Sequence, residues 1–146
     1  MNDDNTGPVS HTYISQRLKL HYVDWGNEGA PPVLLVHGGR DHARSWDWVA
    51  QGLRDDYRVI AVDLRGHGDS QWNTCGTYNT DDFVCDLDKL VDVADLAPVR
   101  IIAHSRIGRV EVSPTRNSVI SVSSNDMTKA KSAAVTAALR MWGKTT

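Results

Sequence analysis

Three short apolar runs constrain the fold of this chain more than any other feature of its sequence. They span residues 33–36, 57–62 and 99–103, and each ends at a polar or glycine-rich turn. Largely continuous runs of valine, isoleucine and leucine are typical of parallel strands that are covered on both faces. Because segments with helical periodicity separate these runs, we predict an α/β fold with a mainly parallel sheet flanked by helices.

The segments around these runs supply the other predicted elements. Residues 12–14 and 18–23 are expected to form strands, and residues 45–53 a short amphipathic helix. A second helical pattern begins at Thr80, whose side chain we expect to cap it. Its apolar side consists of Val84, Leu87, Val91 and Ala94. Its acidic side chains, which we expect to point largely toward water, are Asp86, Asp88, Asp92 and Asp95.

Length and composition indicate one ordinary globular domain. The chain has 146 residues, 40% of them apolar, and a formal net charge of −2. Its lysines and arginines are scattered, so we expect no nucleic-acid partner. No apolar run approaches the roughly 20 residues that span a bilayer, so we expect no membrane partner. The acidic N-terminus is the reverse of a signal peptide, and with only Cys75 and Cys85 present we expect free thiols and a cytoplasmic location.

Polar motifs follow each of the three apolar runs. The sequence reads Leu-Leu-Val-His-Gly-Gly at 34–39, Val-Ile-Ala-Val-Asp-Leu-Arg-Gly-His-Gly-Asp-Ser at 59–70 and Ile-Ile-Ala-His-Ser at 101–105. A serine after a strand is by itself far more often a surface hydroxyl than a nucleophile. In this order and spacing, however, the motifs resemble the α/β-hydrolase family over residues 18–105, in its serine-nucleophile, esterase-like branch. An aspartate at position 105 would instead have indicated dehalogenases or epoxide hydrolases.

This resemblance implies a site for acyl transfer. Ser105 would be the nucleophile at a sharp strand-to-helix turn, and the backbone N–H groups of Gly39 and Arg106 would form the oxyanion hole. The implied substrate is a small molecule with a carboxylic ester or related acyl bond. The resemblance implies no cofactor and no metal.

The polar residues beside this serine have simpler interpretations. We expect His37 to orient its turn through hydrogen bonds rather than to act as a base. The loop after residue 62 should be held in place by its own polar side chains, Asp63, Arg65, His67 and Asp69. A metal site at His37, Asp41 and His42 is not favoured, because no further ligands follow at suitable spacing. Two glycines at 38–39 are too few for a phosphate cradle.

The resemblance fails after Ser105. Ile107 occupies a position where the turn needs a small residue, and Gly108 comes one residue late; overpacking of this kind costs about 1–3 kcal/mol. Beyond Ser105 the sequence contains no histidine, and its acidic residues there are Glu111 and Asp126. The catalytic acid and the histidine that this fold places on later loops are therefore missing from residues 106–146.

We accordingly divide the chain into three parts. Residues 1–9 are expected to be a loose tail, residues 10–105 the N-terminal half of an α/β-hydrolase domain, and residues 106–146 a divergent tail with a helix near 127–142. The abrupt loss of pattern suggests the hypothesis that the last part is frameshifted. Without the family's later strands and lid, the strand at 99–103 would lack a partner on one side. Such an exposed apolar edge would favour self-association.

Three functional hypotheses remain open. The chain is a serine hydrolase by resemblance, weakly active or inactive because its acid and histidine are missing. Alternatively it is a non-catalytic hydrolase-like fragment that binds a small ligand or a partner. In the third hypothesis another chain supplies the missing strands and histidine. Covalent labelling at Ser105 would separate the second hypothesis from the other two.

Overall fold

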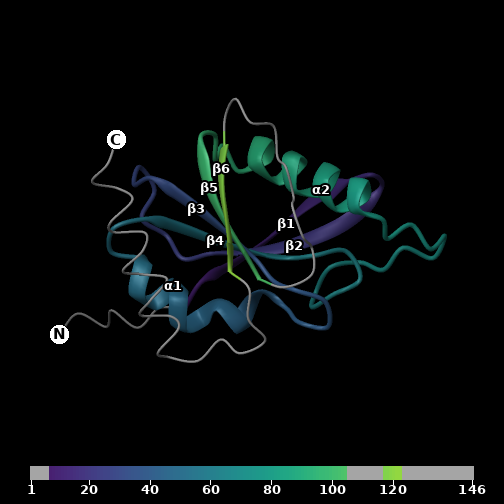
Figure 1. The fold of residues 1–146 in the computed structure, drawn as a ribbon, viewed down its shortest axis with the longest axis horizontal. Coiled ribbons are helices and arrows are strands. Elements are labelled where there is room, and N and C mark those ends of the chain that lie inside the picture. The colour runs from purple at the N-terminus through teal and green to yellow at the C-terminus, as the bar shows by residue number, and fades with distance from the viewer. Residues whose placement is uncertain (1–6, 105–116, 123–146) are drawn as a thin grey trace.

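The computed structural model describes residues 7–104 and 117–122, which contain one mixed sheet and three helical segments (Figure 1). The strands are β1 (Val9–Ser15), β2 (Leu18–Asp24), β3 (Pro32–Val36), β4 (Arg58–Asp63), β5 (Val99–His104) and β6 (Asn117–Val122). The helical segments are the 3-10 helix η1 (Ala43–Trp46), α1 (Asp47–Leu53) and α2 (Thr80–Val93).

The sheet has the order β1-β2-β4-β3-β5-β6. The four strands β4, β3, β5 and β6 run parallel, whereas β2 is antiparallel to both β1 and β4. The three apolar runs form β4, β3 and β5, so they lie inside the sheet with a neighbour on each side. The predicted α/β fold is thus confirmed, with an antiparallel pair added at one edge.

Helices cover both faces of this sheet: α2 packs on one face, and η1 and α1 pack on the other (Figure 1). Alternate residues of the central strands therefore enter two separate cores. Leu34 and Ile101 face the α2 side, while Leu35 and Ile102 face the α1 side, and all four are fully buried. Burial on both faces explains why consecutive residues in the middle of these strands are apolar, rather than every second one.

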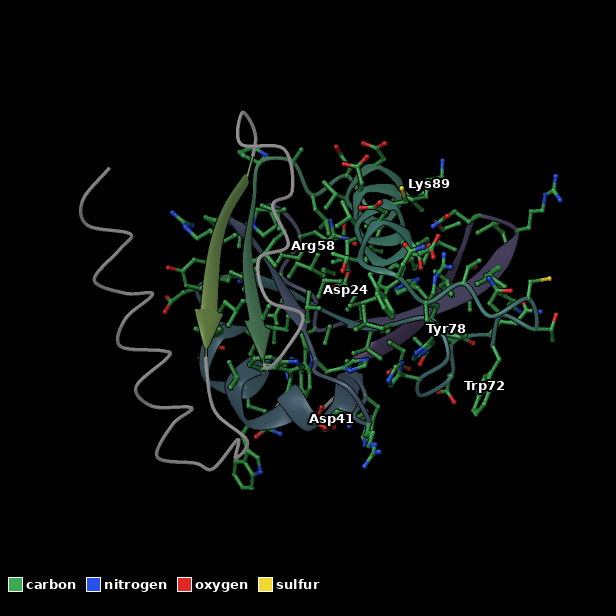
Figure 2. The ribbon with its side chains drawn as sticks, turned by 45° about the vertical axis from the view of Figure 1, so that its right-hand side comes forward. Asp24, Asp41, Arg58, Trp72, Tyr78 and Lys89 are labelled. Atoms are coloured by element: carbon green, nitrogen blue, oxygen red, sulfur yellow. The ribbon has the colours of Figure 1, made fainter. Side chains whose placement is uncertain are left out.

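An ion pair links two strands at the sheet end where β4 begins. Arg58, the first residue of β4, contacts the carboxylate of Asp24, the last residue of β2, at 2.8 Å (Figure 2). The Arg58 guanidinium also donates to the Ala94 carbonyl after α2. Because these contacts lie at the start of the parallel strands, the opposite end, where those strands finish, is left for a functional site.

The N-terminus of α2 differs from the sequence prediction. Asn79, not Thr80, is the N-cap: its side chain accepts a hydrogen bond from the Asp82 N–H, and the Asp82 carboxylate accepts one from the Asn79 N–H. This reciprocal arrangement is a capping box, in which the cap and the residue three positions later satisfy each other's backbone donors. Thr80 is instead the first helical residue.

The prediction that Asp86 points toward water is wrong, because its exposed fraction is only 1%. Its partner Arg65 is equally buried, and the Arg65 Nε lies 2.6 Å from the Asp86 carboxylate. A charged side chain on the buried side of a helix is tolerated where an opposite charge is buried with it. The other predicted acidic positions, Asp88, Asp92 and Asp95, are exposed.

The prediction that the strand at 99–103 lacks a partner on one side is also wrong. β6 pairs with β5 in parallel, from Val99 with Asn117 to His104 with Val122. Part of the segment expected to be a divergent tail thus forms a strand of the sheet. The predicted helix near 127–142 lies outside the described residues. At the other end, β1 begins at Val9, the last residue of the expected loose tail.

Candidate active site

The candidate site lies where β3 and β5 end. Their register pairs Val36 with Ala103, so the turn at 37–39 begins beside the last residues of β5. In Figure 2 the green arrowheads of β5 and β6 point toward the end of the molecule where Asp41 lies. Ser105 and Arg106, the predicted nucleophile and oxyanion donor, lie outside the described residues, but β5 carries the chain to His104, directly before Ser105.

Gly39, the other predicted oxyanion donor, lies in the turn that follows β3. Within residues 7–104, none of the backbone hydrogen bonds outside the helices and strands uses the Gly39 N–H. A Cβ added to Gly39 would meet nothing within 4 Å, so the backbone is open on that side. An oxyanion hole needs backbone N–H groups that are not already hydrogen-bonded, so Gly39 stays a predicted donor.

His37 is buried, and both of its ring nitrogens contact the backbone. Its Nδ1 lies 2.7 Å from the Gly38 carbonyl oxygen, and its Nε2 lies 3.0 Å from the Leu64 nitrogen. Since Leu64 N–H must donate, Nε2 is the acceptor and Nδ1 carries the proton. Burial lowers the pKa of the His37 imidazole from its ordinary 6.5, although the Gly38 carbonyl opposes this effect. His37 therefore joins the turn after β3 to the loop after β4, which is the orienting role expected for it.

His67 lies beside His37, with 5.1 Å between the ring centroids. Its Nδ1 lies 2.9 Å from the Arg65 carbonyl, and its Nε2 accepts from the Arg40 N–H at 3.3 Å. A neutral imidazole has one donor and one acceptor, and here both are used by the backbone. Neither His37 nor His67 thus has a nitrogen left to deprotonate a serine.

Asp63, at the end of β4, organises the following loop. Its carboxylate accepts hydrogen bonds from the Ala43 N–H at 2.7 Å, the Asp69 N–H at 3.0 Å and the His21 ring at 2.7 Å. Burial opposes ionisation of this carboxyl group, but these three donors outweigh it and lower the pKa of Asp63 below 3.8. The predicted structural role of Asp63 is confirmed, and it extends to η1 and β2.

Glycines allow the loop to close tightly around this carboxylate. Gly68 has a φ of +49°, and a Cβ added there would overlap the carboxyl group of Asp63. Gly66 has a φ of +76°, and a Cβ there would come within 2.8 Å of the Tyr78 ring. These two positions need glycine both for backbone conformation and for space.

Sequence reasoning missed the buried network around Asp86. Besides Arg65, the Asp86 carboxylate accepts from Ser15 Oγ at 2.7 Å and from Gln16 Nε2 at 3.0 Å. The network joins α2, the loop after β4 and the end of β1. A signal was present, because Asp86 lies four residues before the apolar Leu90, and side chains at this spacing share one side of a helix.

The acidic and histidine side chains that lie close together are not those of the disfavoured metal site at His37, Asp41 and His42. Among the described residues, His21, Asp63 and Asp69 have ligand atoms within 4.8 Å of one another. Both Asp63 oxygens already accept N–H donors, and His21 Nδ1 is one of those donors. Such occupied atoms describe a hydrogen-bonded cluster better than a cation site.

Two other sequence expectations concern the surface. Cys75 and Cys85 are both free, as predicted, and both are exposed. Within the described part of the chain, no helix is long and apolar enough to cross a membrane.

Comparison with known proteins identifies the family. The sequence profile described as "alpha/beta hydrolase fold" matches residues 31–108, which contain β3, β4, β5 and the turns between them. The chain belongs to the α/β-hydrolase family. The resemblance recognised in its motifs is thereby confirmed.

Individual relatives carry several activities. Epoxide hydrolase 4 of Mus musculus is 31% identical over 114 residues, covering 75% of this chain and 31% of the relative. Esterase Rv0045c of Mycobacterium tuberculosis is 38% identical over 73 residues, covering 50% of this chain and 24% of the relative. The crystal structure of epoxide hydrolase A from Mycobacterium thermoresistibile matches with a TM-score of 0.63 and 30% identity, covering 68% of this chain and 32% of that one. The chain thus spans about a third or less of these relatives' length.

Proposed function

We propose that this chain carries the nucleophile and the oxyanion hole of a serine hydrolase that acts on a carboxylic ester or related acyl bond of a small molecule. The nucleophile is Ser105, and the donors are the backbone N–H groups of Gly39 and Arg106. The family supports hydrolysis as the reaction class, and one relative is an esterase.

One observation carries this proposal: the parallel register that pairs Val36 with Ala103. Through this register, the open Gly39 turn and the end of β5, which leads to Ser105, lie at the same end of the parallel strands. Relatives named as epoxide hydrolases leave the branch of the family open. The serine at position 105, rather than an aspartate, favours the acyl-transfer branch.

The missing base limits the rate that we expect. The sequence has no histidine after Ser105, and both ring nitrogens of His37 and of His67 are hydrogen-bonded to backbone groups. Without a base, catalysis rests on the oxyanion hole and on binding, roughly a thousandfold or more below a complete triad. We therefore propose slow acylation of Ser105 with little turnover by these 146 residues.

A fluorophosphonate probe tests the proposal, because it forms a covalent bond with activated serines. The labelled peptide is identified by mass spectrometry in the wild-type chain and in Ser105→Ala, with the heat-unfolded chain as the control. We expect label on the peptide that contains Ser105 in the folded chain alone. Equal labelling of folded and unfolded chains at this peptide contradicts an activated nucleophile.

The ring nitrogens of His37 and His67 are already hydrogen-bonded, and this favours a second candidate function, that of a non-catalytic module that binds a small ligand. In this case a folded chain carries no label at Ser105. Restored hydrolysis after addition of a second chain that carries the later strands and histidine would instead support completion by a partner.

We also propose a cytoplasmic location. Free, exposed thiols at Cys75 and Cys85 suit a reducing compartment. Cell fractionation tests this, and recovery of the chain outside the cytoplasm contradicts it.

A further inference from the structure

We propose that Ser10, His21 and Asp63 form a second nucleophilic site, separate from Ser105, that accepts an acyl group from activated esters. The three residues come from β1, β2 and the end of β4, which are adjacent strands at the antiparallel edge of the sheet (Figure 1). This site does not depend on the proposed function of Ser105.

The distances are those of a nucleophile, a base and an orienting carboxylate. Ser10 Oγ lies 3.0 Å from His21 Nε2, and His21 Nδ1 lies 2.7 Å from Asp63 Oδ2. The register explains the first contact: Thr12 pairs with His21, so Ser10, two residues along β1, projects from the same face of the sheet. Serine, histidine and aspartate in this geometry define a triad whatever their positions in the chain.

Hydrogen bonds determine which nitrogen of His21 is available. The Asp63 carboxylate is ionised, because N–H donors from Ala43, Asp69 and His21 lower its pKa. An ionised carboxylate can only accept, so His21 Nδ1 must donate to it. In the uncharged tautomer with its proton on Nδ1, Nε2 holds its lone pair toward Ser10 and can accept the hydroxyl proton.

The three side chains differ in their exposure to solvent, as their proposed roles require. His21 and Asp63 have exposed fractions of 7% and 3%, whereas Ser10 is exposed on the edge strand. The base is therefore held in one orientation while the hydroxyl can be reached from solvent. Asp63 and Asp69 each have a carboxylate oxygen within 4.8 Å of a His21 ring nitrogen, and both would stabilise the imidazolium that proton transfer creates.

The reaction that follows from this geometry is acylation by an aryl ester. Ser10 Oγ forms a bond to the carbonyl carbon while its proton passes to His21 Nε2. The bond from that carbon to the aryl oxygen then breaks, the aryl oxygen takes the proton from His21, and a phenol leaves while the acyl group stays on Ser10. An aryl ester has a good leaving group, so this step depends less on oxyanion donors than cleavage of an alkyl ester or an amide.

The first experiment maps fluorophosphonate label in the Ser105→Ala background. We expect the Ser10 peptide to be labelled there, and the label to be lost in Ser105→Ala with Ser10→Ala and in Ser105→Ala with His21→Gln. Label at Ser10 that persists with His21→Gln, or no label at Ser10 in the folded chain, overturns the proposal. Failure at Ser105 is read from a different peptide, so the two sites are judged separately.

The second experiment measures the proton acceptor directly. In Ser10→Cys the introduced thiol lies beside His21, and Cys75 and Cys85 of the same molecule are exposed reference thiols. A thiol next to a histidine has a lowered pKa, so at pH 6 we expect iodoacetamide to alkylate the introduced thiol about tenfold faster than the two references. The difference should shrink at pH 9.

A purely structural histidine would give another result. If the pH profile of the introduced thiol coincides with those of Cys75 and Cys85, His21 does not act as its base and the proposal fails. Adding His21→Gln should remove the rate advantage. Because the reference thiols belong to the same chain, the comparison in Ser10→Cys decides the question even if the double variant does not fold.

Discussion

The His37 side chain accepts a hydrogen bond from the backbone where the turn after β3 meets the loop after β4. Its Nε2 accepts the Leu64 N–H, and that hydrogen bond exists only while the ring is neutral. Protonation would turn the acceptor into a second donor facing another donor. The buried ring should therefore make the stability of the fold depend on pH.

We predict that the chain loses stability on acidification in a way that depends on His37. Because burial lowers the pKa of His37 below 6.5 in the folded state, the unfolded chain binds the proton more readily. The free energy of unfolding should fall as the pH drops below about 6.5, by up to about 1.4 kcal/mol per pH unit, until the folded pKa is reached.

Urea unfolding at pH 7.5, 6.5 and 5.5 measures this effect. Glutamine can also accept the Leu64 N–H but does not titrate, so His37→Gln should have a shallower pH dependence than the wild type. Parallel curves for the two proteins would show that His37 is not the responsible group.

Substitutions of two separate glycines, Gly68 and Gly39, give a second prediction. Gly68→Ala should destabilise the fold by about 2–4 kcal/mol, since its Cβ would overlap the Asp63 carboxyl group in a left-handed backbone conformation. Gly39→Ala is the matched control, because a Cβ there meets nothing within 4 Å. Thermal unfolding of both variants checks this, and equal losses of stability would contradict it.

Helix α2 is held to the rest of the molecule by charge as well as by apolar packing. Asp86 and Arg65 form a buried ion pair at 2.6 Å, and the Arg65 guanidinium also donates to the Thr77 carbonyl at 2.9 Å. The pair joins the helix to the loop after β4, which in turn contacts the turn at 37–39 through His37. Loss of either charge should therefore also disturb the turn at 37–39 in the candidate site.

We predict that Asp86→Ala costs about 3–5 kcal/mol, because it leaves the Arg65 charge buried without its partner. Asp88→Ala, two positions along the same helix and exposed, should change stability by less than about 0.5 kcal/mol. Chemical denaturation of the two variants compares them under one set of conditions. A small effect for Asp86→Ala would mean that the ion pair contributes little to the docking of α2.

In the whole molecule, the presence of β6 determines whether the outer edge of β5 is exposed. It covers the apolar strand β5 along its full length, from Val99 to His104. The expected self-association through an unpaired β5 thus applies only where β6 is displaced. An uncovered strand with apolar residues on both faces is a template for pairing with another chain.

We predict that disrupting β6 promotes self-association. Successive N–H groups of a strand point to opposite sides, so Val119→Pro together with Ile120→Pro removes one donor toward β5 whichever way the strand faces. Sedimentation velocity should then show oligomers that increase with concentration. Ser118→Thr, which keeps its N–H, is the control; a double variant that sediments like this control would contradict a covering role for β6.

The fold class and the order of the elements around the candidate site could be predicted from the sequence. Apolar runs at 33–36, 57–62 and 99–103 can be recognised locally, because a strand buried on both faces is apolar at consecutive positions through its middle. The motifs after those runs are equally local, so the family and the turn at 37–39 could be predicted. The structural roles of His37 and Asp63 followed from the same motifs.

Only the tertiary structure decided which distant residues meet. Asp86 was expected in water, since nothing near it in the sequence reveals that Arg65 would be buried against it. Likewise, the contact of Ser10 with His21 and Asp63 depends on strand register and sheet order, which bring together residues 11 and 42 positions apart. Local periodicity predicts elements, whereas pairing partners depend on the packing of the whole chain.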